Sequence, residues 1–339
     1  MRNWEIVAPV RAGSGDLSCM GGIVSFAGSP RRTLRRTGSV EGKESALATE
    51  IGTEVRQAER ETQSLTELDP ELLAVVRKTR ALAIDLDGTS VLGPVLFPWM
   101  PKLLATIRAT GRRFVFLTNN SSRSDAEHAR LLREKGLDVE AEDVFSSADA
   151  TILYLKPRVR RIYLLAMPSV AEDFERAGFE LTGENPEAVV LAFDLTLTYE
   201  KLDRACFFVR KGVPFLATHR DTTWMVGPDE HKPDCGALAV AVTAATGVRP
   251  RYFGKPEKTM LRGAAQRLGV TKQQMILVGD RLDTDVPMGH RFGIPTVLVL
   301  TGKTKPEDLL SARQQPDFVL KNSGELIPYL SSSRVGSKA

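Results

Sequence analysis

Hydrophobic residues downstream of Arg80 fall into short runs that alternate with stretches of helical spacing. The runs predict strands at residues 81–86, 113–117, 162–166, 188–193, 213–217, 275–279 and 295–299. The helical spacing predicts helices near residues 99–110, 123–135, 199–211, 236–246, 257–268 and 282–291. Most strand runs are continuous rather than alternating, as expected for strands that are covered on both faces. The pattern therefore predicts an α/β protein with a doubly wound parallel sheet.

The residues before this alternation have a different composition. Residues 1–43 are rich in Gly, Ser and Arg, which favours a disordered segment, with an organelle-targeting peptide as the alternative. Residues 44–62 predict a frayed helix, and Asp69-Pro70 predicts a helix start with Asp69 as the N-cap. We therefore expect residues 1–79 to form a largely disordered extension that contains these helices, and residues 331–339 to form a flexible tail.

Composition and charge exclude several classes of protein. The chain of 339 residues is 42% hydrophobic and 26% charged, as is usual for a soluble globular protein. Its net charge of +4 owes much to the arginines of residues 1–40, so we expect no nucleic-acid partner. The 3 cysteines are widely spaced, which favours a reducing compartment. No apolar run approaches the roughly 18 residues that span a bilayer. These observations predict a cytoplasmic protein without a membrane partner, or an organellar one if residues 1–43 are a transit peptide.

Two carboxylates stand where the first predicted strand ends. Asp85 and Asp87 occur where the apolar run 81–86 gives way to a Gly-Thr turn. In open α/β sheets, ligands bind at the carboxyl edge of the strands. Two clustered anions repel each other and lose solvation, so a compensating cation is expected. A hard divalent cation with oxygen ligands fits this need.

Three further segments carry polar residues that suit phosphate chemistry. Thr118 directly follows the strand 113–117 and precedes Asn119. Their hydroxyl and amide groups are suited to bind phosphate oxygens. Taken alone, however, residues 119–122 favour capping of the next helix. Lys255 precedes Pro256, which we expect at N1 of the helix that follows, so the lysine would stand at a helix amino end rather than as a solvated surface residue.

The fourth segment is VGDRLDTD, which ends another apolar strand with acidic residues. Asp280 follows the strand as Asp85 does, whereas Asp283 suits capping and helix-dipole chemistry, and Asp285 follows two residues later. Carboxylates from several strand ends, together with one lysine, form a constellation for Mg²⁺ and phosphate.

These motifs, in this order, resemble those of the haloacid dehalogenase (HAD) superfamily of phosphohydrolases. Residues 85–89 resemble its first motif, Thr118 the second, Lys255 the third and residues 279–285 the fourth. The strings FLTNNSS, VVLAFDLTLTYEKL, GKPEK, VGDRLDTD and GIPTVLVLTGKT are similar to subclass IIA, the branch of the p-nitrophenylphosphatases and the phosphoglycolate phosphatases.

The resemblance implies a domain organisation. A Rossmann-like, HAD-like core would comprise residues 80–149 and 251–330, and an α/β cap domain would be inserted over residues 150–250. Homodimerisation through the cap is common in similar proteins.

The resemblance also implies roles for the motif residues. Asp85 would be the nucleophile that attacks phosphorus, and Asp87 would protonate the leaving alcohol and then deprotonate water. The Asp85 and Asp280 carboxylates and the Asp87 carbonyl would hold Mg²⁺. Asp285 would not bind the ion directly but would orient the groups around it. The groups that grip the phosphoryl oxygens would be Thr118, Asn119 and Lys255.

The expected cap departs from the family pattern in one segment. The usual TNxD reads ATHRD at residues 217–221, so Asp221 matches and is a candidate substrate-binding residue. His219 and Arg220 replace the usual Asn-Pro, and we expect them either to contact an anionic substrate or to lie in a solvated loop. Asp194 is expected to form a structural turn.

The resemblance, together with the residues that carry it, implies a Mg²⁺-dependent phosphatase of small phosphorylated metabolites that works through an aspartyl-phosphate. A dehalogenase has no use for the proton donor Asp87, so that reaction is disfavoured. Two alternatives stay open: a catalytically silent scaffold or binding protein, and a phosphotransferase to an acceptor other than water. The identity of the substrate is not determined by these motifs.

Overall fold

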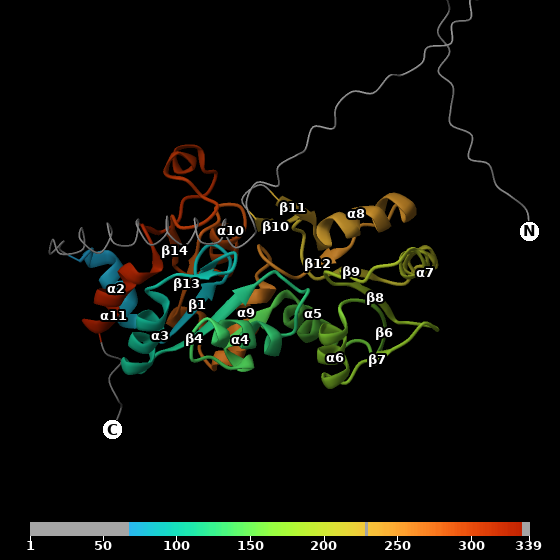
Figure 1. Ribbon diagram of the computed structural model, residues 1–339, viewed down its shortest axis with the longest axis horizontal. Helices are drawn as coiled ribbons and strands as arrows, with labels where there is room; N and C mark the ends of the chain where they lie inside the picture. The colour runs from blue at the N-terminus through green and yellow to red at the C-terminus, as the bar shows by residue number, and fades with distance from the viewer. Residues whose placement is uncertain (1–67, 228–229, 334–339) are drawn as a thin grey trace, which may run out of the picture. The chain divides into compact units, whose positions relative to one another are not determined.

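The structure is a computed structural model that describes residues 68–227 and 230–333 (Figure 1). The predicted helix at residues 44–62 and the expectations for residues 1–43 lie outside the described residues. Within the described ranges, no helix is long and apolar enough to cross a membrane.

One of the two larger sheets is parallel and has six strands, three from before and three from after the second sheet in the chain. It confirms the predicted α/β class. Its order is β15-β14-β13-β1-β4-β5, and every adjacent pair is parallel. The strands in chain order are β1 (Ala81–Asp85), β4 (Arg113–Thr118), β5 (Val144–Ser146), β13 (Met275–Gly279), β14 (Thr296–Val299) and β15 (Phe318–Leu320). The sequence did not predict β5 or β15, which are 3 residues long each and lie at the two edges of the sheet.

Helices cover both faces of this sheet (Figure 1). Alternate residues of β1 point to opposite sides: Ala83 packs in one hydrophobic cluster and Ile84 in the other. The first cluster includes residues of α5 (Ser147–Leu155), α9 (Thr259–Leu268) and α10 (Asp285–Phe292). The second includes residues of α2 (Pro70–Lys78), α3 (Met100–Ala109), α4 (Asp125–Glu134) and α11 (Leu326–Ser331). Burial on both faces explains the continuous apolar runs of the strands.

A second parallel sheet lies between α5 and α9 in the chain. Its order is β12-β9-β8-β6-β7. Its strands are β6 (Arg161–Leu165), β7 (Glu180–Leu181), β8 (Ala188–Leu191), β9 (Phe215–Ala217) and β12 (Arg251–Tyr252), with helices α6 (Pro168–Arg176), α7 (Tyr199–Arg210) and α8 (Cys235–Thr246).

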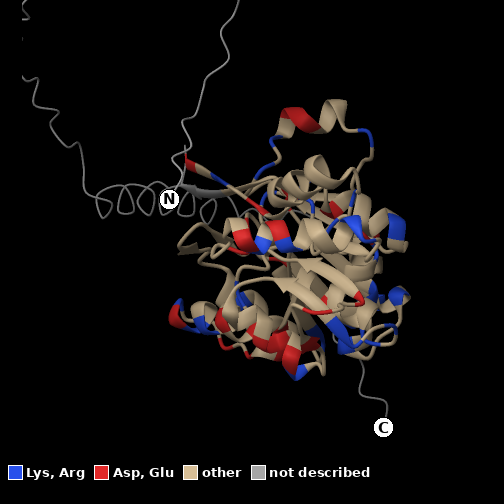
Figure 2. Cartoon of the chain, turned by 90° about the vertical axis from the view of Figure 1, so that its right-hand side faces the viewer, with Lys and Arg blue, Asp and Glu red and all other residues tan. Residues whose placement is uncertain are grey.

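Acidic and basic residues are interspersed over the elements that face the viewer in Figure 2.

Two antiparallel hairpins and four short 3₁₀ helices complete the described chain. The hairpins are β2 (Val91–Leu92) with β3 (Val95–Leu96), and β10 (Thr223–Gly227) with β11 (Glu230–Pro233). The 3₁₀ helices are η1 (Ala141–Asp143), η2 (Lys272–Gln274), η3 (Pro306–Ser311) and η4 (Ser323–Glu325).

Three boundaries differ from those expected. β12 pairs with β9, so residues 251–252 belong to the second sheet rather than to the first. Helix α2 is not part of a loose extension, because its apolar side is buried: Leu72 and Val76 lie in the same cluster as β1. Its predicted N-cap is confirmed, since Asp69 Oδ1 accepts hydrogen bonds from two backbone amides of the first turn. Ser333, expected in a flexible tail, is buried.

A buried arginine ties both ends of the described chain to β4. The Arg112 side chain is 3% exposed, and its Nε and Nη2 atoms each lie 3.0 Å from a carbonyl oxygen at the end of α2, those of Thr79 and Val76. Nη2 also donates to the backbone carbonyl and, at 3.0 Å, to the hydroxyl of Ser333. One guanidinium thereby donates to buried carbonyl groups at the end of α2 and at Ser333.

We predict that Arg112→Met lowers the free energy of unfolding by about 2 to 4 kcal/mol, because it removes the side-chain donor to the buried carbonyl groups of Thr79 and Ser333. Urea titration followed by circular dichroism measures the change. The matched control is Arg130→Met, which removes an exposed ion pair with Glu134 and should cost less than about 0.5 kcal/mol. Equal losses in the two variants would contradict this role for Arg112.

Candidate functional site

Three buried carboxylates meet at the carboxyl edge of the first sheet. Asp85 ends β1, Asp280 directly follows β13, and these two strands are adjacent and parallel. Asp285 is the first residue of α10. Ligand oxygens of the three side chains lie within 4.8 Å of one another, and the residues are 6%, 1% and 0% exposed. The structure thus brings together the acidic residues that the sequence placed at separate strand ends.

Lys255 neutralises part of this negative charge. Its Nζ contacts Asp85 Oδ1 directly and lies 2.9 Å from Asp285 Oδ1, and the residue is only 3% exposed. Burial alone would lower the lysine pKa, but the two carboxylates outweigh it and hold the pKa above its usual value. Lys255 therefore stays protonated and lies between two anions.

The local setting of Lys255 differs from the one expected. We placed Pro256 at N1 of the following helix, but α9 begins only at Thr259. The intervening residues form turns in which Glu257 N donates to Gly254 O and Met260 N donates to Glu257 O. The expectation that Lys255 stands at the helix amino end was wrong, and its partners are side-chain carboxylates.

Oxygen atoms of this cluster lack partners in a way that fits a cation. Asp85 Oδ2 and Asp280 Oδ1 are buried without a hydrogen-bond donor. Burial, with Asp85 and Asp285 close by, raises the pKa of Asp280 well above its usual value. A buried carboxylate oxygen without a partner is costly, and carboxylate oxygens are the ligands that hard divalent cations prefer. The donor set of Asp85 and Asp280 therefore fits a divalent metal ion.

Backbone groups fix the two acidic residues of the fourth motif. Asp280 Oδ2 accepts a hydrogen bond of 2.6 Å from Lys303 N, and Asp285 Oδ2 accepts one of 3.1 Å from Arg281 N. Gly88 has a φ of +92°, and a Cβ atom there would lie 2.5 Å from Asp280 Oδ2. Glycine is therefore required in the first motif both for its backbone conformation and for the space that Asp280 occupies.

Asp87 stands apart from the three clustered carboxylates. It lies in the turn after β1, where Gly88 N donates to Val91 O, and the residue as a whole is open to solvent. Neighbouring protein atoms still take part of the water from the carboxyl group and raise its pKa above the usual value, against the opposing charges of Lys255, Arg123 and Arg281. A carboxyl group with a raised pKa at an open position is suited to donate a proton.

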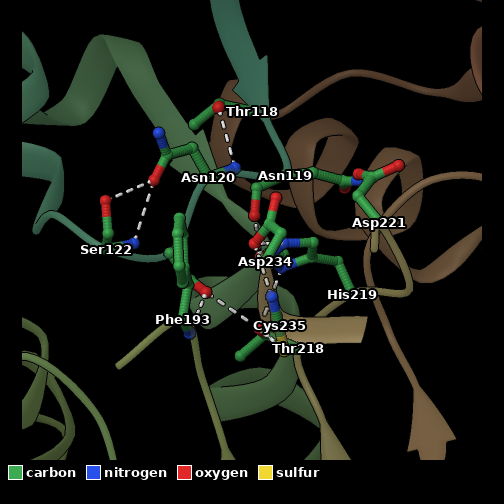
Figure 3. Close-up of polar contacts among 12 residues, drawn as sticks. Thr118, Asn119, Asn120, Ser122, Phe193, Thr218, His219, Asp221, Asp234 and Cys235 are labelled. Atoms are coloured by element: carbon green, nitrogen blue, oxygen red, sulfur yellow. Dashed lines mark hydrogen bonds and ion pairs between the residues drawn. The ribbon is translucent and has the colours of Figure 1, made fainter. Parts of the chain in front are cut away.

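The second motif places Thr118 and Asn119 beside Asp85. In the register of β1 and β4, Asp85 pairs with Leu117, so Thr118 lies one residue further along the same edge. Thr118 Oγ1 accepts a hydrogen bond from Asn120 N at 3.0 Å (Figure 3). Residues 119–122 do not cap the next helix, since its N-cap is Ser124 with a capping box to Glu127.

The side chain of Asn119 joins two parts of the site. Its Oδ1 accepts from Lys255 N at 2.7 Å, and its Nδ2 donates to Asp221 Oδ2 at 2.7 Å. The predicted site residue Asp221 therefore reaches the site from the segment that follows β9 and lies next to Asn119 (Figure 3). Asn119 links it to the backbone of Lys255.

Sequence reasoning missed Arg281, which holds the other oxygen of Asp221. Its Nη2 lies 3.1 Å from Asp221 Oδ1, and its Nε lies 2.9 Å from Asp283 Oδ1. Burial would raise the pKa of Asp221, but the charge of Arg281 and the hydrogen bonds from Asn119 and Arg281 outweigh it and lower the pKa. Asp283 was expected to cap α10 and instead pairs with Arg281 and Lys303. The sequence does carry a signal for Arg281, because this residue directly follows Asp280 in the fourth motif.

The other polar candidates have structural partners. His219 does not lie in a solvated loop, because it is 0% exposed and its Nε2 lies 2.9 Å from Asp234 Oδ1. Arg220 pairs with Glu257. Asp194 forms the expected turn, accepting from the backbone and hydroxyl of Thr196.

Comparisons with known proteins agree with this geometry. Two family models match the chain: one described as haloacid dehalogenase-like hydrolase over residues 82–180, and one described as HAD-hydrolase-like over residues 252–326. The 5'-nucleotidase YutF of Bacillus subtilis is 32% identical over 251 residues, which cover 73% of this chain and 97% of that protein. Dihydroxyacetone phosphatase of Corynebacterium glutamicum is 32% identical over 244 residues, which cover 71% of this chain and 88% of that protein.

Solved structures show the same relationship. The 4-nitrophenylphosphatase of Thermotoga maritima has a TM-score of 0.71 and 42% identity, with 75% of this chain and 98% of that chain covered. A glycerol phosphate phosphatase of Mycobacterium tuberculosis, solved in complex with magnesium, has a TM-score of 0.69 and 28% identity, with 77% and 78% covered. The carboxylate cluster, the buried lysine and these matches agree, and the chain belongs to the haloacid dehalogenase-like hydrolases, in subclass IIA.

Proposed function

We propose that the protein is a Mg²⁺-dependent phosphatase that hydrolyses small phosphate monoesters through an aspartyl-phosphate. The observation that carries the proposal is the cluster of Asp85, Asp280 and Asp285 around Lys255, with two carboxylate oxygens buried and unpartnered. The names of the relatives, which include a dihydroxyacetone phosphatase, phosphoglycolate phosphatases and acid sugar phosphatases, support small metabolites as substrates.

In this proposal, Asp85 and Asp280 hold the magnesium ion with their carboxylates, and Asp87 contributes its backbone carbonyl. The ion supplies positive charge that neutralises the phosphoryl oxygens. Asp285 is less suited to act as a ligand, because its Oδ1 lies 2.9 Å from Lys255 Nζ and its Oδ2 accepts from Arg281 N. Its role is to orient Lys255.

The two carboxylates of the first motif divide the chemistry. Asp85, ionised beside Lys255, attacks phosphorus, and the bond between phosphorus and the leaving oxygen breaks as the aspartyl-phosphate forms. Asp87 gives its proton to the leaving oxygen. It then removes a proton from water, which attacks phosphorus and releases Asp85 and inorganic phosphate. The raised pKa of Asp87 supports its role as the acid.

Thr118, Asn119 and Lys255 complete the phosphoryl site. Lys255 supplies charge, Thr118 supplies a hydroxyl at the same edge, and the side chain of Asn119 supports the Lys255 backbone. We assign the segments expected as residues 80–149 and 251–330 to a catalytic core, with residues 251–252 moved to the cap because β12 pairs with β9, and residues 150–250 to the cap, which delivers Asp221. Association of two copies through the cap and a cytoplasmic location belong to the same proposal, supported by the family resemblance and the composition.

We predict that Asp85→Asn lowers kcat for p-nitrophenyl phosphate by about 10³-fold or more, because an amide is a poor nucleophile. Release of p-nitrophenol in the presence of Mg²⁺ measures the loss. The matched control is Asp138→Asn at a side chain that is 95% exposed, which should retain full activity. Activity that survives Asp85→Asn in a folded protein would refute the assignment.

We also predict a pH dependence for the stability of the metal-free protein. Burial, with a contribution from Asp85 and against the charge of Lys255, raises the pKa of Asp285 from 3.8 to about 6. The folded chain then keeps a proton that the unfolded chain releases, so the free energy of unfolding in EDTA falls as the pH rises from about 4 to 6, by about 2 to 3 kcal/mol for this group. Urea titration in EDTA across this range measures the fall.

Magnesium should reverse this loss, because a bound cation replaces the protons. Thermal unfolding should show a larger Mg²⁺-induced rise in Tm at pH 7.5 than at pH 5, and no rise in Asp280→Asn. The variant Asp138→Asn again serves as the control. An equal Mg²⁺-induced rise in Tm at both pH values, or in Asp280→Asn, would contradict the assigned metal site.

A further inference from the structure

One fully buried histidine beside the site has no part in the proposed chemistry. His219 lies in the segment that carries Asp221, and both of its ring nitrogens have partners (Figure 3). Nε2 lies 2.9 Å from Asp234 Oδ1, and Nδ1 lies 3.1 Å from Thr218 Oγ1. A buried polar ring with two partners in fixed positions has one preferred arrangement of its hydrogens.

The contact with Asp234 determines that His219 Nε2 carries a hydrogen. A carboxylate only accepts hydrogen bonds, and the same Asp234 oxygen also accepts from Cys235 N at 2.6 Å, where Asp234 is the N-cap of α8. The His219 Nε2 atom must therefore carry a hydrogen and donate it to Asp234.

The contacts of Thr218 indicate that the other ring nitrogen, His219 Nδ1, accepts a hydrogen bond. Phe193 N donates to Ser121 Oγ at 3.0 Å, and Ser121 Oγ lies 2.9 Å from Thr218 Oγ1. Thr218 Oγ1 has two further neighbours, His219 Nδ1 at 3.1 Å and Cys235 Sγ at 3.5 Å. The ring nitrogen is the nearer and the stronger acceptor, so Thr218 donates to His219 Nδ1 and Ser121 donates to Thr218. Ser147 Oγ, 3.4 Å from Nδ1, gives its own hydrogen to the Asn119 carbonyl at 2.7 Å. The hydrogen bonds therefore run in one direction from Phe193 to Asp234.

This chain of hydrogen bonds connects the two sheets directly behind the site. Ser121 belongs to the loop after β4, whereas Thr218 follows β9 and Asp234 precedes α8. The backbone of Thr218 also supports the Lys255 loop, because Gly254 N donates to Thr218 O at 2.6 Å. A Cβ atom on Gly254 would lie 2.7 Å from His219 Cβ, so the loop rests against the histidine itself.

We propose that His219 is a positioning residue that donates from Nε2 to Asp234, accepts at Nδ1 from Thr218, and so fixes the segment of Thr218 to Asp221 against the Lys255 loop. Two contacts transmit its effect to Lys255: Thr218 O binds Gly254 N, and Asp221 binds Asn119, which accepts from Lys255 N. This inference rests on the proposed phosphatase function and adds a residue that tunes the geometry of the lysine.

The first experiment compares His219→Ala with His219→Gln. Alanine removes both hydrogen bonds, so kcat for p-nitrophenyl phosphate should fall about 10- to 100-fold as Lys255 loses its exact placement, with a smaller change in KM. The glutamine side-chain amide keeps a donor for Asp234 and should retain at least about a fifth of kcat. The matched control is His231→Ala at an exposed position of β11, which should be unchanged. A wild-type kcat in His219→Ala would overturn the proposal.

A second pair of variants covers the case in which His219→Ala does not fold. Thr218→Val removes the donor to Nδ1 at nearly the same volume, and Thr218→Ser keeps a hydroxyl. Thr218→Val should lower kcat by about 10-fold and Thr218→Ser by less than about 3-fold, each in protein whose Tm is within a few degrees of the wild type. Equal kcat values in these two variants would also overturn the proposal.

The tautomer is tested without any turnover. In protein labelled with ¹⁵N-histidine, long-range ¹H–¹⁵N spectra should assign His219 a protonated Nε2 and an unprotonated Nδ1, and Thr218→Val should shift the Nδ1 resonance. A hydrogen on Nδ1 would contradict the inferred direction of the chain. A wild-type protein that hydrolyses no phosphate ester would refute the proposed function alone, because the tautomer would still report on the hydrogen-bond chain.

Discussion

The structure depends on the balance of charge between three buried carboxylates and one buried lysine. Asp85, Asp280 and Asp285 lie close enough to repel one another strongly, and Lys255 offsets only part of their charge. Such a cluster lowers the stability of the fold unless a further cation joins it, and its unpartnered oxygens fit a divalent cation. The doubly wound sheet makes the cluster possible, because parallel neighbouring strands end at one edge.

The second sheet contributes to the same site through Asp221, which lies outside the cluster of Asp85, Asp280 and Asp285. Asp221 is held by Asn119 and Arg281, both from loops of the first sheet. Behind it, the hydrogen-bond chain through Thr218 and His219 joins the two sheets again. Two independent sets of polar contacts therefore fix the segment of Thr218 to Asp221 relative to Lys255. Polar contacts of this kind depend strongly on geometry.

Several local features were predictable because they depend on short stretches of sequence. The buried strands β1, β4 and β13 were recognised from continuous apolar runs, and the start of α2 was recognised from Asp69-Pro70. The short edge strands β5 and β15 were missed because 3 residues carry too little pattern. The start of α9 was misplaced because proline at the first helical position is a preference, and hydrogen-bonded turns around Glu257 delay the helix.

The sequence by itself determined the fold class, the long buried strands β1, β4 and β13 and the acidic residues Asp85 and Asp280 at the ends of two of them, because periodicity and strand-end chemistry are local properties. Only the tertiary structure decided which partners those residues have. The links of Asn119 with Asp221, of Arg281 with Asp221 and of His219 with Asp234 join positions 102, 60 and 15 residues apart. Such pairs arise when separate loops pack together, and no spacing in a single sequence reports them.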